Sequence, residues 1–487
     1  MTLTLLGLGP GDIDDLSRRA WRTLKAARKV ILRTAQHTCV PDLPQVDGEE
    51  PIHYQSCDDL YEMIPEFKNV YTAIVERVLT AARAGDVVYA VPGDPMVGES
   101  TVPRLLEAAK AEHIPVEIVN GISFVEPVLR VVGHDALDGL QILDGIAVAA
   151  LHHPPINPDY PALLGQVYSR TVAANVKLTL MNQYPDDFMV VLLHAAGTDT
   201  MQTETLPLYQ IDRSPHIRHM TTLFVPALGE MSSFEQFQEI IAHLRAPEGC
   251  PWDREQTHQS LRRYLLEETH EVLEALDEDD PQALYQELGD LLLQVVLHTQ
   301  VAIDEGEFKM TDVLRHINAK LIHRHPHVWG DVAVSGAGEV LANWDVLKKQ
   351  EHAAQGIRRE SVLDGVPKGL PALMQAYEYQ SKAAKPGFDW EKIDDVAAKV
   401  REELEEVLTA PTAAARAEEI GDLLFVLVNW ARWLKIEPET ALRETCAKFS
   451  RRFRYIETTL AAQGRALTDS NLAEMDGLWN EAKAKGL

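Results

Sequence analysis

The second half of the chain contains an internal repeat, which limits the folds available to it more than any other feature. Each copy carries an Asp/Trp pair, an EExxE motif, an ExxD motif, a KxxxR pair and a WxxxK pair, in that order. The first copy has Trp252-Asp253, Glu267-Glu268-x-x-Glu271, Glu287-x-x-Asp290, Lys320-x-x-x-Arg324 and Trp344-x-x-x-Lys348. The second copy has Asp389-Trp390, Glu402-Glu403-x-x-Glu406, Glu419-x-x-Asp422, Lys448-x-x-x-Arg452 and Trp479-x-x-x-Lys483. Because a repeated unit folds in the same way each time, the repeat predicts two similar helical domains.

The first 227 residues have a different pattern and predict an α/β fold. Short apolar runs typical of strands occur at 2–6, 30–32, 87–91, 116–119, 190–194 and 222–225, and helical patterns occur at about 15–27, 67–84 and 98–112. Alternation of this kind predicts a largely parallel sheet with crossover helices. Strand-like runs become denser after about residue 140, which predicts a second subdomain.

From Met231 onward, amphipathic helical patterns dominate the chain. A segment with several Gly and Pro residues, 353–371, has the composition of a linker. We therefore predict an α/β domain at 1–229, a first helical domain at 231–352 and a second helical domain at 361–487. The predicted fold class is multidomain, with an α/β half of two subdomains followed by an all-α half.

The EExxE and ExxD motifs predict clusters of carboxylates. Residues three and four apart share a helix face, so Glu402 and Glu403 lie near Glu406, and Glu419 shares a face with Asp422. The short segment between the motifs allows a helical hairpin that brings the two faces together. Such close like charges require compensation, and oxygen ligands favour Mg²⁺, with Mn²⁺ or Ca²⁺ as alternatives. A solvated acidic surface is the competing interpretation for one motif, but the duplication favours a metal site.

Cationic and aromatic residues near the end of the second copy fit a polyphosphate ligand. Lys448 and Arg452 stand four residues apart on one predicted helix, as do Trp479 and Lys483. Lys and Arg can neutralise phosphate oxygens, and a tryptophan ring can stack on a base or a sugar. Surface ion pairs and a core tryptophan explain the same residues equally well, so both interpretations stay open at this point.

The charge balance excludes some partners. Asp and Glu outnumber Lys and Arg by 74 to 46, a formal net charge of −28, which argues against binding to nucleic acid or to an anionic membrane surface. The four cysteines form no CxxC pair, so reduced thiols of a cytoplasmic protein fit better than disulfides or a zinc site. We expect no signal peptide and no transmembrane helix, because no apolar run is long enough.

The repeated motifs, with CPWD at 250–253 and HRHPHVWG at 323–330, resemble the MazG family of all-α nucleoside triphosphate pyrophosphohydrolases over about 231–487. The resemblance implies Mg²⁺-dependent hydrolysis of nucleoside triphosphates to monophosphate and pyrophosphate by direct attack of water, and a homodimer or higher oligomer. It implies a metal held by Glu403, Glu406, Glu419 and Asp422, with Glu402 orienting the metal or the water. It implies a nucleotide contacted by Lys399, Lys448, Arg452, Trp479 and Lys483. The first copy repeats the metal-binding pattern with Glu268, Glu271, Glu287 and Asp290.

The resemblance also implies that the second copy is the active one, and two residues agree with this. Lys399 and Arg416 each stand three residues before an acidic motif of the second copy, where the first copy has Tyr264 and Leu284. The first copy keeps all its carboxylates, so slow hydrolysis by it and a purely supporting role in dimerisation both stay open.

Two glycine-containing turns follow predicted strands in the α/β half, at 7–12 (GLGPGD) and 91–95 (VPGDP). Glycine permits close approach of the backbone to a ligand, and ligands bind at strand ends in such sheets. Two purely structural turns are an equally good interpretation of either motif alone.

Together with ILRTAQHTCV at 31–40, QVYSR at 166–170 and VKLTLMNQYPDD at 176–187, the two turns resemble the tetrapyrrole methylase family over about 1–227. The resemblance implies an S-adenosylmethionine pocket lined by Gly93, Asp94, Val97 and Ser123, with the segment 7–12 shaping the floor on the acceptor side. Pro92 departs from the family, which often has glycine there. Two alternatives to the hydrolase therefore remain: a methyltransferase whose helical half is a dimerisation scaffold, and a non-catalytic nucleotide sensor.

Overall fold

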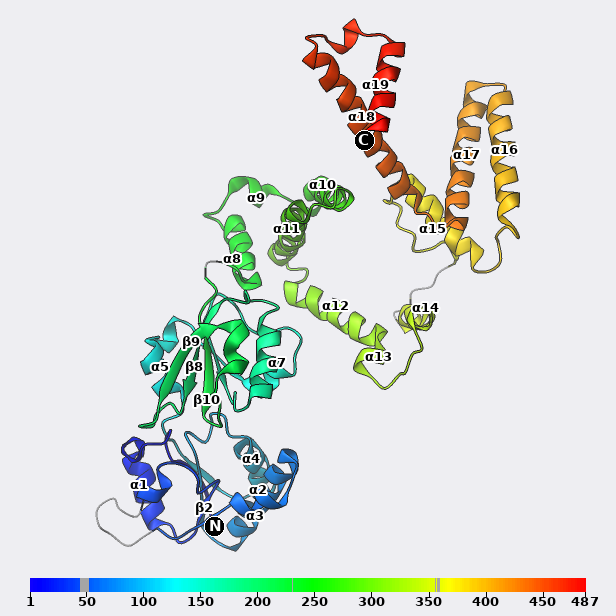
Figure 1. Cartoon of the computed structure of the whole chain (residues 1–487). Helices are drawn as coiled ribbons and strands as arrows, with labels where there is room; N and C mark the ends of the chain where they lie inside the picture. The colour runs from blue at the N-terminus through cyan, green and yellow to red at the C-terminus, as the bar shows by residue number, and fades with distance from the viewer. Residues whose placement is uncertain (44–51, 230, 355, 357–359) are drawn as a thin grey trace. The chain divides into compact units, whose positions relative to one another are not determined.

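The computed structural model describes residues 1–43, 52–229, 231–354, 356 and 360–487 (Figure 1). The chain forms two compact units, Met1–Arg254 and Glu255–Leu487. The first unit is α/β and the second is all-α, as predicted from the sequence. The three-way division at residues 229, 352 and 361 stays a prediction, and part of the proposed linker 353–371 lies outside the described residues.

The first sheet of the α/β unit is wholly parallel. Its strands are β1 (Leu3–Gly7), β2 (Val30–Leu32), β3 (Tyr54–Ser56), β4 (Val87–Val91) and β5 (Val116–Val119), in the order β3-β2-β4-β1-β5. The side chains of β1, β2 and β4 are buried on both faces, as expected of a parallel sheet covered by helices. The parallel sheet predicted from the sequence is confirmed here.

Helices cover both faces of this sheet. On one face, α3 (Phe67–Ala84) and α4 (Thr101–Ala111) pack against Leu3 and Leu5 of β1. On the other face, α1 (Arg18–Ala26) packs against Leu6 of β1. Successive residues of a strand point to opposite faces, so one apolar strand serves two core layers.

The second sheet differs from the expectation of a largely parallel fold. Its strands are β6 (Gln141–Asp144), β7 (Ala162–Gly165), β8 (Met189–His194), β9 (Gln202–Pro207) and β10 (Thr221–Val225), in the order β6-β7-β10-β8-β9. Only β6 and β7 pair in parallel; the other neighbours are antiparallel. The connection from β8 to β9 is too short for a crossover helix, which forces these strands to run in opposite directions. The predicted second subdomain is confirmed.

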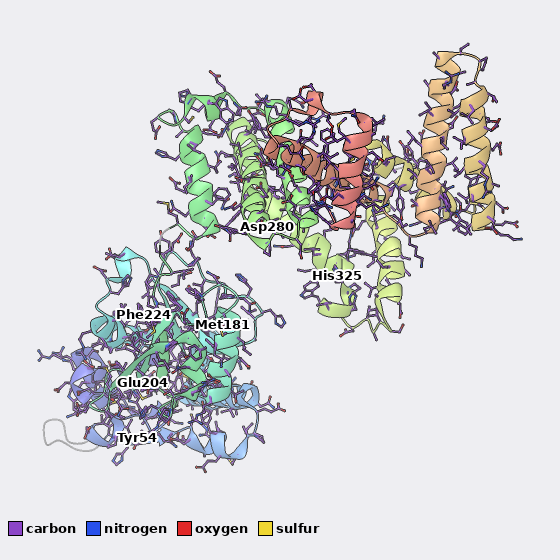
Figure 2. All side chains as sticks on the ribbon, turned by 45° about the horizontal axis from the view of Figure 1, so that its top comes forward. Tyr54, Met181, Glu204, Phe224, Asp280 and His325 are labelled. Atoms are coloured by element: carbon purple, nitrogen blue, oxygen red, sulfur yellow. The ribbon has the colours of Figure 1, made fainter. Side chains whose placement is uncertain are left out.

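One helix links the two subdomains of the α/β unit, and a backbone bridge links two loops of the first subdomain. Helix α5 (Val125–Val132) follows the first sheet, but its Val125 and Val128 pack with Phe224 of the second sheet, labelled in Figure 2. Gly9 and Gly93 form a backbone bridge, with hydrogen bonds of 3.2 Å and 2.7 Å. The glycine turns predicted as ligand-binding segments therefore lie side by side.

The second unit contains only helices and connecting turns. Its helices are α10 (His258–Asp277), α11 (Pro281–Glu305), α12 (Met310–Arg324), α13 (Pro326–Trp329), α14 (Ala337–Ala354), α15 (Ala372–Ala384), α16 (Ile393–Thr409), α17 (Ala413–Trp433), α18 (Pro438–Ala462) and α19 (Leu472–Ala484). Asp280, labelled in Figure 2, caps α11 by accepting a hydrogen bond of 2.9 Å from the amide of Gln282, and Pro281 occupies the first helical position. Among the described helices, none is long and apolar enough to cross a membrane.

Candidate functional site

The acidic motifs of the second copy lie on the helical hairpin formed by α16 and α17 (Figure 1). The hydroxyl of Thr412 starts α17 by accepting a hydrogen bond of 3.1 Å from the amide of Ala415. Glu403, Glu406 and Glu419 each place one carboxylate oxygen within 4.8 Å of the others. The predicted hairpin is therefore present, and it brings three of the predicted metal ligands together.

Lys399 balances part of this negative charge. Its ammonium group lies 2.8 Å from an oxygen of Glu402 and 2.8 Å from an oxygen of Glu403. These hydrogen bonds raise the pKa of Lys399. Glu403 is only 5% exposed, whereas Glu402 is exposed. Lys399 thus fixes a buried carboxylate at the cluster and holds a second, solvent-facing one beside it.

The carboxyl group of Glu419 is affected by repulsion from the other carboxylates of the cluster. Its partial burial, together with the charges of Glu406, Glu403 and Asp422, raises the pKa of its carboxyl group. Asp422 is outside the group of three closest oxygens but near enough to act on Glu419. A cation would remove this repulsion, and a donor set of carboxylate oxygens alone suits a hard ion such as Mg²⁺. The residues present therefore fit the implied metal.

The first copy forms a matching cluster on α10 and α11. Glu268, Glu271 and Glu287 have carboxylate oxygens within 4.8 Å of one another. Burial, followed by the charges of Asp290 and Glu271, raises the pKa of Glu268. The structure therefore brings three of the four predicted metal ligands of the first copy together, and Asp290 lies outside this group.

Sequence reasoning missed Gln294, which is 4% exposed and directs its amide nitrogen toward an oxygen of Glu268 at 3.5 Å. Its amide oxygen has no hydrogen-bond partner among the described residues. Gln294 stands four residues after Asp290 on α11, and this spacing was the available signal.

The two clusters differ in the residues that precede them. Tyr264, at the position of Lys399, accepts a hydrogen bond from the guanidinium of Arg263. Arg416 donates a hydrogen bond of 3.2 Å to the carbonyl of Ala410, so it secures the turn of the α16–α17 hairpin. Among the described residues, Lys399 is thus the distinguishing cation at the second cluster.

The cations and the tryptophan predicted to contact nucleotide lie on α18 and α19. The guanidinium of Arg452 stacks 5.4 Å from the ring centre of Trp479 and donates a hydrogen bond of 2.7 Å to the carbonyl of Leu487. Across the described part of the chain, no hydrogen bond or ion pair joins Lys448, Arg452 or Lys483 to the carboxylates of α16 and α17. The structure therefore brings Arg452 and Trp479 together, but leaves their contact with nucleotide as a prediction.

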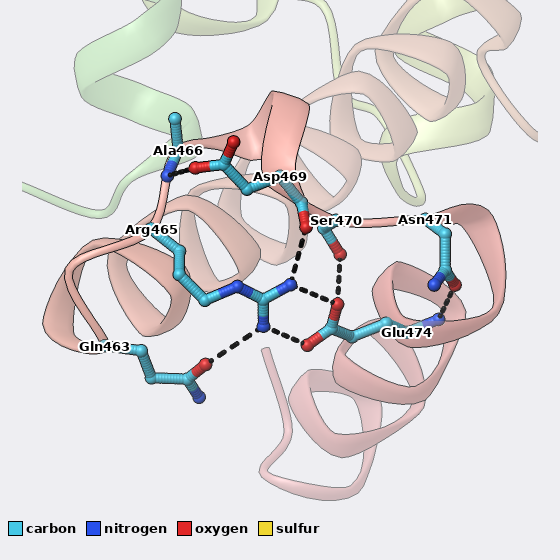
Figure 3. Close-up of polar contacts among 7 residues, drawn as sticks. All are labelled: Gln463, Arg465, Ala466, Asp469, Ser470, Asn471 and Glu474. Atoms are coloured by element: carbon cyan, nitrogen blue, oxygen red, sulfur yellow. Dashed lines mark hydrogen bonds and ion pairs between the residues drawn. The ribbon is translucent and has the colours of Figure 1, made fainter.

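Figure 3 shows the turn that positions α19. Arg465 makes two hydrogen bonds to the carboxylate of Glu474, at 2.5 Å and 2.8 Å, and a third of 2.7 Å to the carbonyl of Asp469. Ser470 donates a hydrogen bond of 2.7 Å to Glu474, and Asn471 caps α19. The guanidinium of Arg465 lowers the pKa of Glu474 to about 2. This network fixes the helix that carries the Trp–Lys pair.

The structure contains a third group of possible metal ligands that was not predicted from the sequence. His258, Glu305 and Glu307 have ligand atoms within 4.8 Å of one another, where α10 begins and α11 ends. The ring of His258 also lies parallel to that of His298, with 2.8 Å between their Nδ1 atoms. No helical spacing links His258 to the others, because the hairpin alone brings them together.

The α/β unit contains a cavity of about 630 Å³ between its two subdomains. Ligand sites for small molecules span roughly 300–1,000 Å³, so the volume suits a cofactor of ordinary size. Of the residues predicted to bind S-adenosylmethionine, Gly93 and Val97 line it. Gly93 has φ of +66°, a conformation that favours glycine, so the cavity depends on this residue type.

Asp94 and Ser123 are buried close to the cavity but are not among its described lining residues. Asp94 accepts hydrogen bonds of 2.8 Å from the amide of Met96 and 3.1 Å from the amide of Gly121. Ser123 donates a hydrogen bond of 2.5 Å to Glu126. Both side chains hold neighbouring loops in place, and their role as cofactor ligands stays a prediction.

The family models that match the chain fall separately on its α/β part and on its helical part. The sequence model of the tetrapyrrole (corrin/porphyrin) methylases matches residues 2–212. The sequence model of the MazG nucleotide pyrophosphohydrolase domain matches residues 256–329, which contain the acidic motifs of the first copy. The second copy is identified by its repeated motifs.

Known relatives extend the match. The uncharacterized protein YabN of Bacillus subtilis is 43% identical over 489 residues, which cover 99% of this chain and 98% of that protein. The nucleoside triphosphate pyrophosphohydrolase/pyrophosphatase MazG of Thermotoga maritima is 42% identical over 250 residues, 51% of this chain and 95% of that protein. The nucleoside triphosphate pyrophosphohydrolase of Escherichia coli K12 is 43% identical over 259 residues, 52% of this chain and 98% of that protein. The chain therefore belongs to the MazG family of nucleoside triphosphate pyrophosphohydrolases, in a form that carries an N-terminal tetrapyrrole methylase domain.

Proposed function

We propose that the chain hydrolyses nucleoside triphosphates to monophosphate and pyrophosphate at the α16–α17 hairpin, and that the reaction requires Mg²⁺. Membership of the family supports hydrolysis of nucleoside triphosphates. The proposal of a Mg²⁺-dependent site on this hairpin rests on the convergence of Glu403, Glu406 and Glu419 within 4.8 Å, beside Lys399. A dimerisation scaffold alone has no use for such a cluster, because clustered like charges oppose folding.

In this proposal the predicted site residues have different roles. Glu403, Glu406, Glu419 and Asp422 would hold the metal, which would supply positive charge to the phosphates and lower the pKa of water. Glu402, which is exposed next to Lys399, orients the attacking water and can accept its proton. The water attacks the phosphorus at the α–β linkage, and the electron pair of the broken P–O bond leaves with pyrophosphate. Lys448, Arg452, Trp479 and Lys483 contact the nucleotide.

Self-association is part of the proposal. The α16–α17 hairpin exposes a row of leucine and isoleucine side chains, each 39% to 67% exposed: Leu404, Leu408, Ile420, Leu424 and Leu427. Their spacing of three or four residues puts the exposed side chains of each helix on one face, and apolar surface of this kind favours an interaction site. Packing of the hairpin against a second copy of the chain covers this surface, which favours a homodimer or a higher oligomer.

Removal of the metal tests the proposal. With EDTA, we expect the full-length chain to release no pyrophosphate from any common nucleoside triphosphate, and added Mg²⁺ or Mn²⁺ to restore release. The measurement is a coupled pyrophosphate assay over a panel of nucleotides. Binding of a nucleotide with Mg²⁺ but without turnover would identify a nucleotide sensor and overturn the proposal.

The raised pKa of Glu419 predicts how stability depends on pH. A carboxyl whose pKa is raised by folding contributes stability below its ordinary value of 4.5, and this contribution is lost as pH rises through the folded pKa. Without metal, the melting temperature of wild type relative to Glu419→Gln is therefore expected to fall as pH rises from about 4.5. Saturating Mg²⁺ is expected to reverse the trend, because the cation binds the deprotonated carboxylate.

Thermal unfolding of both proteins at a series of pH values, in EDTA and in Mg²⁺, measures this difference. Parallel curves for wild type and Glu419→Gln in EDTA would show that the Glu419 carboxyl does not feel the neighbouring charges.

A separate observation supports a second activity, in the α/β unit. The cavity between the α/β subdomains, lined by Gly93 and Val97, favours binding of S-adenosylmethionine and methyl transfer by the first unit. We propose this activity in addition to the hydrolase, because the two sites use different residues of different units.

A further inference from the structure

The cavity of the α/β unit has an acidic lining. Among its described lining residues, Arg33 is the one permanent cation, whereas Asp58, Glu62 and Glu99 carry carboxylates. The rest of the lining is uncharged or histidine. The balance of fixed charge in the cavity is thus negative, which disfavours an anionic ligand.

The single cation is already committed to other groups. The guanidinium of Arg33 pairs with a carboxylate oxygen of Glu99 at 3.2 Å, and both side chains are nearly buried, at 14% and 9% exposed. The guanidinium also stacks over the rings of Tyr61 and Tyr71, at 4.8 Å and 5.3 Å from their centres. Glu99 in turn accepts a hydrogen bond of 2.7 Å from the hydroxyl of Thr101. The carboxylate of Glu99 therefore offsets the positive charge of Arg33 within the cavity, although the guanidinium keeps further N–H donors.

Two carboxylates of the cavity have no cationic partner among the described residues. Asp58 accepts hydrogen bonds of 2.6 Å from the hydroxyl of Thr34 and 2.8 Å from the amide of Ala35. Glu62 lies four residues later on α2 (Asp58–Met63), and thus on the same helix face. No ion pair to either carboxylate is found among the described residues. These two negative charges remain to be balanced by a ligand.

His37 adds a polar group without adding charge. It is 8% exposed and lines the cavity, and its Nε2 has no hydrogen-bond partner among the described residues. Burial lowers the pKa of His37 to about 4, so the ring is neutral near pH 7. A neutral imidazole can orient a ligand by one hydrogen bond, but it cannot balance a carboxylate.

From this lining we propose that the methyl acceptor of the α/β unit is uncharged or positively charged, and that the cavity rejects the polycarboxylate tetrapyrroles. Asp58 and Glu62 face the acceptor, and His37 offers it a hydrogen bond. The inference rests on the proposed binding of S-adenosylmethionine and is independent of the hydrolase. It departs from the substrate class after which the matched family is named, because uroporphyrin and related tetrapyrroles carry carboxylates that would meet like charges here.

The transfer itself balances with such an acceptor. A lone pair of the acceptor forms the bond to the methyl carbon, the carbon–sulfur bond breaks, and its electron pair stays on sulfur as S-adenosylhomocysteine. The acceptor then loses a proton to a carboxylate such as Asp58 or to water. No oxidant or further reactant is required.

A pair of planar probes of similar size but opposite charge tests the inference. The probes are N-methylquinolinium and quinoline-2-carboxylate, titrated by calorimetry into the full-length chain saturated with S-adenosylhomocysteine. At about pH 8 an ordinary histidine is uncharged. We expect the cation to bind at least about tenfold more tightly than the anion. Asp58→Asn/Glu62→Gln should remove this preference, and uroporphyrin should not bind wild type.

Glu107→Gln is the matched control. Glu107 is an exposed carboxylate of α4 outside the cavity lining, so its removal changes the net charge but should leave the preference intact. Tighter binding of the anion, binding of uroporphyrin to wild type, or a preference that survives Asp58→Asn/Glu62→Gln would each overturn the inference. Failure of S-adenosylhomocysteine to bind would instead overturn the cofactor proposal, and the probes alone would still report the charge of the cavity.

Discussion

Replacing Glu403 and Glu406 by glutamine is expected to lower the rate of pyrophosphate release at least about 100-fold, because changing even an outer-shell partner of a metal ligand typically costs about 10–100-fold. The two glutamines keep the size of the side chains but remove two of the three converging charges. The measurement is the steady-state rate with saturating Mg²⁺ and nucleoside triphosphate, accompanied by circular dichroism to show that the helices persist.

The first copy provides the matched control. Glu268→Gln/Glu271→Gln makes the same chemical change in a cluster of the same geometry, which has Tyr264 in place of Lys399. If the second copy is the working site, this variant should retain most of the wild-type rate. Equal loss in both variants would show that the copies act together, and loss only in the first-copy variant would reverse the assignment.

Gly121→Ala is expected to destabilise the α/β unit by about 1–3 kcal/mol, the usual cost of overpacking a tight core. A Cβ at this position would overlap the carbonyl oxygen of Gly93 and lie 3.0 Å from the Cα of Gly7. These atoms are backbone, so they cannot turn aside as a flexible side chain can. Amide hydrogen exchange in β1 and β4 should speed up by roughly 5- to 150-fold, and binding of S-adenosylhomocysteine should be lost.

Gly85→Ala is the control for this prediction. Gly85 has an extended φ of 170°, and a Cβ there would meet nothing within 4 Å. Alanine should be tolerated or slightly stabilising at such a position. Similar exchange rates in both variants would mean that the contact of the three glycines does not limit the stability of this unit.

Local pattern was sufficient to predict the hairpin and its acidic face. The spacing of Glu403 and Glu406 on one helix, and of Glu419 and Asp422 on the next, determines which side chains share a face. A short turn then leaves antiparallel packing as the simplest arrangement of the two helices. The parallel strands β2, β4 and β5 were predicted with the bounds that the structure has. The strands β2 and β4 are buried and form continuous apolar runs, whereas β5 lies at the edge of the sheet and is only partly buried.

Contacts between distant residues were beyond sequence reasoning. Arg33 and Glu99 stand 66 residues apart, and only the fold of the first sheet brings them together. The group of His258, Glu305 and Glu307 likewise depends on where two helices start and end. The antiparallel second sheet was missed because strand direction follows from connection length, which apolar runs do not report.

Arg452 and Trp479 illustrate a further limit. Their types suit a nucleotide, but the same types also stack on each other, as they do here at 5.4 Å. Sequence alone could not decide which contact forms in the protein without ligand. The geometry of the carboxylates was more predictable, because it follows from helix periodicity and needs no choice of partner.

The central claim is tested most directly by hydrolysis of ATP in ¹⁸O-labelled water by the full-length chain with Mg²⁺, followed by mass spectrometry of the products. AMP and pyrophosphate are expected in equal amounts, with no product in EDTA; ¹⁸O is expected in AMP, because pyrophosphate is the leaving group, and none in orthophosphate. Release of ADP and labelled orthophosphate, or the same turnover in EDTA, would contradict it.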